Sequence, residues 1–363
     1  MKKNEIHVIY GNNPCKMVYD VLVKAQIAKE LNPDMHIGIK PNLVVAKPAA
    51  TGATTSPLAV EGVIKYLQDN GMKKITIMEG SWVGDNTKQA FRACGYEDLA
   101  RKYNIPLVDL KDDSIVVKKV ENLELKICKQ ALAVDFLINM PVLKAHCQTL
   151  LTCALKNMKG CIPDSEKRRF HSLGLHKPIG YLNKAITPEL IIVDGMCGDL
   201  TFEEGGNPVQ MDRIILGKDP VLMDTYAASL LGYAKEEIEY IGIAESVGVG
   251  SSDLAKAQIH EHNVEMKNGK EFRPSDRARK LVAGRVTAEE ACSACYGSLV
   301  HALQRMDENH RLQSIKKPIY IGQGFRGKEL KGLGIGQCTS KCNEYISGCP
   351  PTAKDIVDFL ERG

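Results

Sequence analysis

The sequence lacks long hydrophobic runs and a strong charge of one sign. Its longest apolar candidate, residues 131–143, is interrupted by Asp135 and Asn139 and is shorter than the roughly 18 residues of a membrane-spanning helix. No signal-peptide core adjoins the start. The net charge of +4 over 363 residues is too small and too dispersed to indicate nucleic-acid binding. We therefore expect a cytoplasmic protein that binds neither membranes nor nucleic acids.

Several catalytic motifs are also missing. The chain has no G-x-S-x-G, no G-x-x-x-x-G-K-[ST] and no H-E-x-x-H, which disfavours a serine hydrolase, a P-loop enzyme and a zinc protease. The run His260-Glu261-His262 has the wrong spacing for one face of a helix, so we expect it to face solvent. The run 322–327 matches the dinucleotide-binding pattern G-x-G-x-x-G, but the glycines at 332, 334 and 336 leave little room for the long helix that should follow it. Without a flavin or nicotinamide site, redox chemistry would need an external electron donor, such as a ferredoxin.

Cysteine, by contrast, is abundant. Of twelve cysteines, five lie in the last quarter of the chain, as Cys292-x2-Cys295 and Cys338-x3-Cys342-x6-Cys349. In a reducing compartment this number favours metal or redox use over disulfides. A [4Fe–4S] cluster needs four thiolates, usually with one pair close in sequence, and often has proline after the last cysteine, as Pro350 is here. The pattern predicts an iron–sulfur site.

Five cysteines exceed the need of one cluster. We predict Cys292, Cys295, Cys338 and Cys349 as the ligands, with Cys342 as the alternative fourth ligand, because it would follow Cys338 by about one turn if that segment were helical. The glycine-rich stretch 332–337 before Cys338 would let the backbone approach the cluster closely. Structural Zn²⁺ bound by four cysteines explains the same spacings and stays an alternative. The other, scattered cysteines are expected to be buried, inert thiols.

The first two thirds of the chain predict an α/β domain, a layered sheet with flanking helices, since short apolar runs alternate with amphipathic ones. Two helices have clear starts at Ser56-Pro57 and Asp219-Pro220. We expect an α/β domain at 1–250, a polar connecting segment at 251–285 and a smaller cysteine-rich cluster module at 286–363. The expected strands are 36–45, 74–78, 107–110, 135–139, 189–193, 213–216 and, in the module, 318–322.

Polar residues follow several of the expected strands, where α/β sheets bind ligands. A small anionic substrate is expected to be bound by residues that include two lysines three apart, which share a helix face. The predicted anion-binding residues are Lys40, Asn42, Lys156, Lys159 and Asp194. His146, Glu79 and Lys144 are the predicted catalytic residues, with His146 or Glu79 as proton donor. An ordinary solvated basic surface is the alternative for the lysines.

An ordered series of motifs within residues 36–250 resembles the DUF362 family, a domain of unknown function. The motifs are Lys40-Pro41-Asn42-Leu43, 52–57, Glu79-Gly80-Ser81, 139–146, 155–160 and Asp194-Gly195. The resemblance implies an α/β domain, often accompanied by an iron–sulfur element and typical of anaerobic bacteria and archaea. The cysteines do not match the common tandem C-x2-C-x2-C-x3-C insert. A fainter similarity, near Lys159 and His146, is to the nickel-pincer lactate racemase fold.

Together these features predict a [4Fe–4S] protein, an oxidoreductase that passes electrons to a small anionic substrate. An electron carrier or redox sensor without its own substrate is one alternative. A non-redox racemase-like or lyase-like enzyme is another. The chain is also compatible with a homo-oligomer.

Overall fold

The computed structural model describes residues 1–273 and 277–362, with the backbone alone for 277–279. The described chain divides into two compact units. One holds residues 1–167 and 176–273, and the other holds 168–175 and 277–362. None of the helices in the described ranges combines the length and apolarity needed to span a bilayer.

The first unit is built on an eight-stranded mixed sheet with the order β12-β1-β11-β10-β7-β2-β3-β4. Neighbours from β10 to β4 run parallel, whereas β11 is antiparallel to both β10 and β1. Two hairpins, β5–β6 and β8–β9, stand apart from it. The strands are β1 (Glu5–Tyr10), β2 (His36–Pro41), β3 (Lys74–Glu79), β4 (Leu107–Asp109), β5 (Ile115–Val120), β6 (Leu123–Cys128), β7 (Phe136–Met140), β8 (Lys144–His146), β9 (Leu150–Thr152), β10 (Leu190–Asp199), β11 (Pro208–Gly217) and β12 (Gln258–His262).

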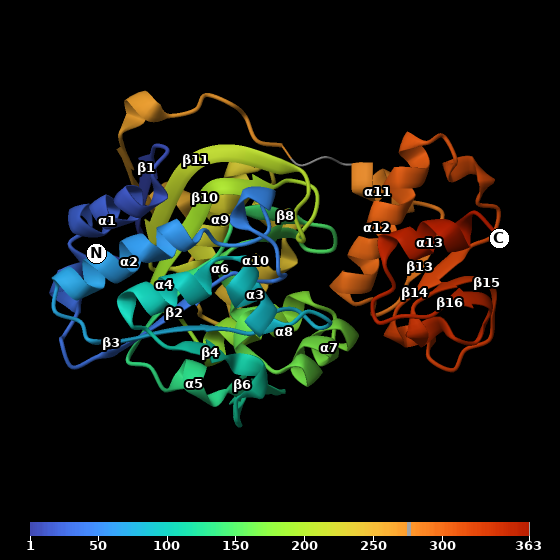
Figure 1. Ribbon diagram of the computed structural model, residues 1–363, viewed down its shortest axis with the longest axis horizontal. Coiled ribbons are helices and arrows are strands. Elements are labelled where there is room, and N and C mark those ends of the chain that lie inside the picture. Colours follow the sequence, from blue (N-terminus) through green and yellow to red (C-terminus); the bar gives the residue numbers. More distant parts are fainter. Residues whose placement is uncertain (274–276, 363) are drawn as a thin grey trace. The chain divides into compact units, whose positions relative to one another are not determined.

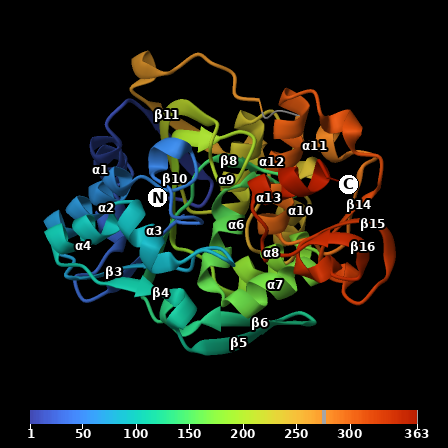
Figure 2. The ribbon, with the colours of Figure 1, turned by 45° about the vertical axis from the view of Figure 1, so that its right-hand side comes forward.

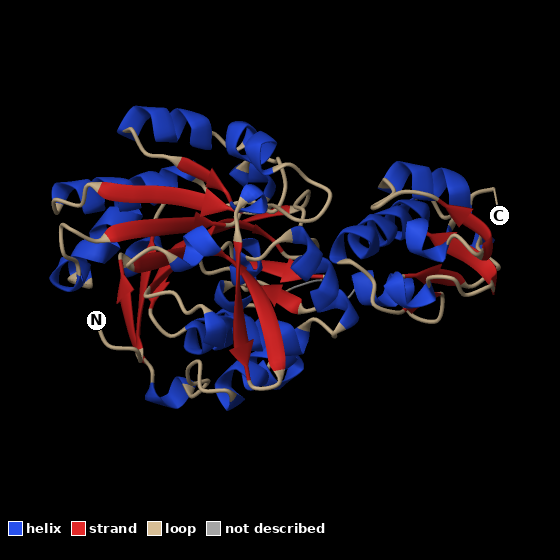
Figure 3. Ribbon diagram, turned by 90° about the horizontal axis from the view of Figure 1, so that it is seen from below, coloured by secondary structure: helices blue, strands red, loops and turns tan. Residues whose placement is uncertain are grey.

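Helices cover both sides of this sheet (Figure 3). Helices α1 and α2 lie side by side (Figures 1 and 2), and their apolar residues share one core with β2, β3 and β7. The central strands are nearly continuous apolar runs, as expected for parallel strands that are buried on both faces. The helices are α1 (Pro14–Lys24), α2 (Pro57–Asp69), α3 (Thr87–Ala93), α4 (Tyr96–Tyr103), α5 (Lys129–Leu132), α6 (Ala154–Asn157), α8 (His176–Ala185), α9 (Pro220–Leu230) and α10 (Glu239–Ser246). Helix α7 (Asp164–Ser172) begins in this unit, and its residues from 168 onward belong to the second.

The predicted α/β class is confirmed. Both expected helix starts occur, as α2 and α9, and the Asp219 carboxylate accepts hydrogen bonds from the first N–H groups of α9. The strand expected at 36–45 is shorter and ends at Pro41. It ends there because Asn42 turns its backbone N–H to Thr55 Oγ1 and its carbonyl to the Thr55 N–H, rather than to a neighbouring strand.

The segment 251–285, expected to connect two domains, contributes a strand to the large sheet. Residues 258–262 form β12, which runs parallel to β1 along the sheet edge. Its polar sequence reflects this position, because an edge strand with exposed side chains needs no apolar alternation. The division between the units falls later in the chain than the change of character near residue 250.

The second unit has a four-stranded sheet, β13-β14-β15-β16, in which all neighbours are parallel. Helix α12 packs Leu299 and Leu303 against Ile319 and Ile335 of the sheet. Part of the glycine-rich stretch lies within a strand: Gly332 and Gly334 are inside β15, where a side chain would collide with Pro318 and Thr339. The elements are α11 (Arg277–Val282), β13 (Val286–Ala288), α12 (Ser293–Glu308), β14 (Ile319–Ile321), β15 (Leu330–Ile335), β16 (Cys342–Ile346) and α13 (Ala353–Leu360).

Candidate functional site

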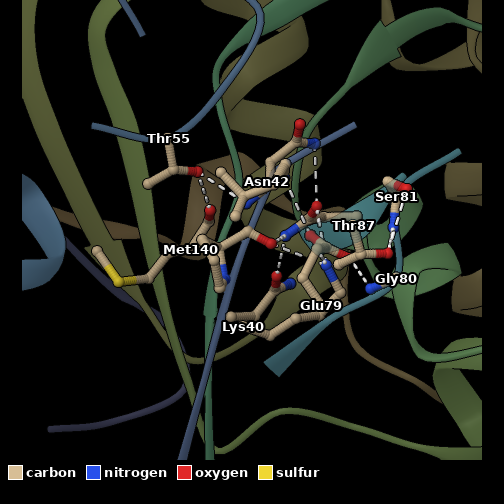
Figure 4. Close-up of polar contacts among 12 residues, drawn as sticks. Lys40, Asn42, Thr55, Glu79, Gly80, Ser81, Thr87 and Met140 are labelled. Atoms are coloured by element: carbon tan, nitrogen blue, oxygen red, sulfur yellow. Dashed lines mark hydrogen bonds and ion pairs between the residues drawn. The ribbon is translucent and has the colours of Figure 1, made fainter. Parts of the chain in front are cut away.

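Two of the predicted polar residues form a buried ion pair at the ends of β2 and β3. Lys40 Nζ lies 3.0 Å from Glu79 Oε2, and the two side chains are 0% and 3% exposed. Figure 4 shows Lys40 pointing from β2 to Glu79 of β3. The Glu79 carboxylate also accepts the backbone N–H groups of Leu43 and Gly80. Glu79 is therefore held by three partners, and a side chain at Gly160 would collide with it.

Two asparagines join this pair to its surroundings. Asn157 Oδ1 accepts from Lys40 Nζ at 3.2 Å and from Asn42 Nδ2 at 2.9 Å, while its Nδ2 donates to Asn139 Oδ1 at 2.7 Å. Asn157 lies at the end of α6, so it ties that helix to the ends of β2 and β7. The Asn42 Oδ1 accepts from Lys144 Nζ at 3.2 Å. One polar network thus runs from Glu79 to Lys144.

The ammonium group of Lys144 is fully used within the protein. This side chain at the start of β8 is 0% exposed, and burial lowers its pKa to about 8. An ammonium group has three N–H donors, and Lys144 Nζ contacts three acceptors: Asn42 Oδ1 (3.2 Å), Ala53 O (2.5 Å) and Glu203 O (2.8 Å). Lys40 Nζ likewise has Glu79, Asn157 and Pro41 O. Both lysines therefore hold backbone carbonyl groups of the site in place, at Pro41 for Lys40 and at Ala53 and Glu203 for Lys144.

His146, Lys156 and Glu203 form a second buried group. Glu203 places Oε1 2.5 Å from Lys156 Nζ and Oε2 2.7 Å from His146 Nε2. His146 Nδ1 accepts the backbone N–H groups of Gln148 and Thr149, which leaves the proton of a neutral imidazole on Nε2. Nε2 is close to the carboxylate but makes no hydrogen bond within the described residues. Burial lowers the pKa of His146 to about 4. Burial opposes ionisation of Glu203, yet Lys156 and His146 hold its pKa well below the usual value.

The neighbouring Glu204 behaves differently. Burial, and then the Glu203 carboxylate, raise its pKa from 4.5 to about 7. Its Oε2 has no hydrogen-bond partner among the residues that the structure describes. A carboxyl group that is buried, close to lysines and able to exchange a proton near neutral pH is a candidate general acid or base.

The remaining predicted residues lie at different places around this network. Asp194 in β10 accepts the backbone N–H of Ser56 at 2.7 Å and of Met196 at 3.0 Å, so its carboxylate stabilises the start of α2. No hydrogen bond or ion pair within the described ranges joins it to Lys40 or His146. Lys159 is half-buried and lies within electrostatic reach of His146.

Sequence reasoning missed three residues of this site: Asn157, Glu203 and Glu204. Asn157 lies within the motif 155–160, which was noted for its two lysines. Its side-chain amide, between those lysines, could have marked it as a further polar residue of the site. Glu203-Glu204 precede Gly205, whose φ of +70° marks a tight turn, but nothing in the sequence connects this turn to a lysine about 50 residues away.

The Glu204 pKa predicts a specific pH dependence of stability. Between the unfolded and folded pKa values the folded state holds more protons, so the free energy of unfolding should fall as pH rises from about 4.5 to 7. The decline should be on the order of 2–3 kcal/mol, since one pKa unit corresponds to about 1.4 kcal/mol. Glu204→Gln should remove this part of the decline. Urea denaturation at pH 5 to 8, followed by the fluorescence of Trp82, the chain's one tryptophan, measures it.

The exposed Glu236 provides the control, because Glu236→Gln should follow the wild-type pH profile. Asp224 is also buried, with a pKa raised by burial to about 7, but its contribution is common to all three proteins and cancels in the comparison. Parallel wild-type and Glu204→Gln profiles would contradict the assignment.

In the second unit, four of the five clustered cysteines follow the carboxyl ends of parallel strands. Cys292 and Cys295 come after β13, at the N-cap and in the first turn of α12. Cys338 follows β15, and Cys349 follows β16. Because the carboxyl ends of parallel strands all lie at the same end of a sheet, these four cysteines lie at that end.

Electrostatic and backbone contacts connect the four thiols. Burial, and then the nearby Cys292, Cys349 and Cys338, raise the pKa of Cys295. The loops that carry Cys338 and Cys349 are joined by a 3.0 Å hydrogen bond from the Gln337 N–H to the Gly348 carbonyl. Arg326, which follows β14, donates from Nε to Cys338 Sγ at 3.4 Å.

Cys342 occupies the opposite end of the sheet. It is the first residue of β16, whereas Cys349 follows the last residue, Ile346. Four residue-to-residue steps along the strand place Cys342 about 13 Å from Ile346 at the usual rise per residue. Cys342 is 6% exposed, and burial raises its pKa. The helical arrangement that would have brought Cys342 next to Cys338 is not formed.

Four thiols at one end of a sheet match the number of thiolates that an iron–sulfur cluster takes. As the side chains stand, no three His, Cys, Asp or Glu residues in the described ranges surround a single ion. A cluster calls for a wider arrangement, because each thiolate binds a different iron atom. Gly336, with a φ of +86°, keeps the space beside Cys295 open. Arg326 supplies an N–H donor to the Cys338 sulfur, the kind of contact that tunes a metal centre when the sulfur is a ligand.

Comparison with known proteins shows to which family the chain belongs, through a match within the first unit. Residues 37–229, more than half of the chain, match the family described as "Domain of unknown function (DUF362)". The chain therefore belongs to the DUF362 family. A thylakoid-associated protein of Synechocystis sp. is 24% identical over 301 residues, which cover 81% of this chain and 88% of that protein.

Among solved structures, the lactate racemase apoprotein from Thermoanaerobacterium thermosaccharolyticum is similar, with a TM-score of 0.40 and 15% sequence identity. The match covers 64% of this chain and 57% of the racemase. This likeness is too distant to indicate anything about activity.

Proposed function

We propose that this DUF362 protein is an iron–sulfur oxidoreductase, with a [4Fe–4S] cluster held by Cys292, Cys295, Cys338 and Cys349. The observation that carries the proposal is the position of these four thiols after the carboxyl ends of three parallel strands, with Cys342 at the other end of its strand. When bound, the cluster would supply one electron at a time. An external donor, such as a ferredoxin, would deliver the electrons.

The second part of the proposal concerns the substrate, a small anion bound in the first unit. Lys40 and Lys144 have their donors occupied by protein acceptors, so Lys156 is the better candidate for the anion. Lys156 would bind the substrate charge, neutral His146 would keep Glu203 oriented, and Glu204 would give or take a proton. The opposite protonation tendencies of Glu203 and Glu204 support this division of roles.

Anaerobic purification, followed by iron and sulfide analysis and EPR of the reduced protein, tests the cluster. We expect about four iron and four sulfide per chain and the EPR signal of a reduced cluster. About one zinc and no sulfide would instead assign the four cysteines to a structural zinc site and would contradict the redox function.

A non-redox proton transfer is the second candidate, and the titration of Glu204 near neutral pH favours it. Exchange of a substrate carbon-bound hydrogen with D₂O separates the two. Exchange that persists in protein without iron would support the racemase-like or lyase-like alternative, since electron transfer would then be unnecessary.

A further inference from the structure

Three of the nine histidines of the chain meet at the edge of the large sheet, far from the buried network. His7 lies on β1, and His260 and His262 lie on β12. The run His260-Glu261-His262 was expected to face solvent because its spacing does not suit a helix. On a strand, however, alternate residues share a face, so both histidines project to the same side.

The parallel pairing of β1 with β12 brings the third histidine beside them. His7 is paired with His260, and Ile9 with His262. The His7 ring centroid lies 4.7 Å from that of His260 and 5.4 Å from that of His262. His7 Nδ1 and His262 Nε2 are hydrogen-bonded at 3.2 Å, so one of the two rings carries the shared proton. Two nitrogens bound to one tetrahedral zinc are separated by about 3.3 Å, given zinc–nitrogen distances of 2.0–2.1 Å.

We propose that His7, His260 and His262 bind a divalent transition-metal ion of the zinc, nickel or copper class. Imidazole nitrogens suit these ions. His7 is 8% exposed and is fixed in the sheet, while His260 is exposed and can turn its ring to complete the set. Some turn is required, because the three rings do not surround one point as they stand.

The charges near these rings leave a place for a carboxylate ligand. Glu5 precedes His7 by two residues on β1, so it shares the same face, and it lies within electrostatic reach of His7. It would be the fourth ligand if it released the Lys2 N–H that it now accepts at 2.8 Å. The N-terminal ammonium near His7 and Lys24 near His262 oppose a cation, so three imidazoles without Glu5 would bind weakly.

Titration of the full chain, free of any affinity tag, with Co²⁺ tests this site. Cobalt bound by imidazole gives visible d–d bands without a thiolate-to-cobalt charge-transfer band, which separates it from cobalt bound by the clustered cysteines. We expect about one equivalent of such cobalt per chain. It should be lost in His7→Asn and His262→Asn.

His310→Asn is the matched control. His310 is exposed and has a φ of +56°, a conformation that asparagine tolerates well, so this variant should bind cobalt as the wild type does. If buried His7→Asn fails to fold, as judged by far-UV circular dichroism, the exposed His260→Asn decides in its place. The proposal would be overturned if His262→Asn still bound cobalt without a thiolate charge-transfer band. It would also be overturned if the wild type bound cobalt only with that band.

Discussion

Cys295→Ala is expected to reduce the iron and sulfide content to background and to abolish the EPR signal of the reduced protein. Cys295 lies in the first turn of α12, within electrostatic reach of the other three thiols. Removing it would leave three ligands for a cluster that takes four. Iron and sulfide analysis under anaerobic conditions measures the effect directly.

Cys342→Ala is the control for this experiment. It removes the same atom from the same module, but at the amino end of β16 and not at the carboxyl end. The cluster should therefore keep its full iron and sulfide content and its EPR signal. Loss of the cluster in Cys342→Ala together with its retention in Cys295→Ala would reverse the ligand assignment.

Lys40→Met is expected to destabilise the first unit by about 3–5 kcal/mol, because it leaves the buried carboxylate of Glu79 without its counter-charge. The pair is 3.0 Å apart and almost fully buried, and Gly160 covers it closely. Urea denaturation followed by Trp82 fluorescence reports on this unit, since Trp82 lies just after β3. The double variant Lys40→Met with Glu79→Gln should recover part of the loss, because no unpaired charge would remain.

The surface pair Lys88–Asp112 gives a control with the same 3.0 Å separation, but both its side chains are 68% exposed. Lys88→Met should leave the free energy of unfolding almost unchanged, since water solvates the remaining carboxylate. Equal losses for Lys40→Met and Lys88→Met would show that burial of the Lys40–Glu79 pair has no energetic consequence.

Both predictions concern residues at the ends of parallel strands. The sequence was sufficient to predict some features of these sites, and others depend on the tertiary structure. The apolar runs and the helix starts with proline at the first helical position were sufficient to predict the α/β class, because they reflect local conformational preferences and burial. The motifs around Lys40, Glu79 and Lys144 were recognisable as polar residues at or just after the ends of apolar strands.

The sequence did not predict which donors were already occupied. Lys40 and Lys144 were natural candidates for anion binding, yet backbone carbonyls and asparagine side chains use their N–H groups. Glu204 was missed because its raised pKa comes from burial and from its neighbour Glu203, and neither burial nor lysine contacts at long range can be read from spacing.

The sequence by itself determined the chemistry that is available: five clustered thiols and the lysines and other residue types of the DUF362 motifs. Tertiary structure decided which of these residues meet. Cys342 is separated from Cys349 because both ends of one strand cannot lie at the same edge of a sheet. His7 reaches His260 and His262 because β1 and β12, about 250 residues apart in sequence, pair in parallel. Such pairings depend on the packing of the whole sheet, which no local pattern encodes.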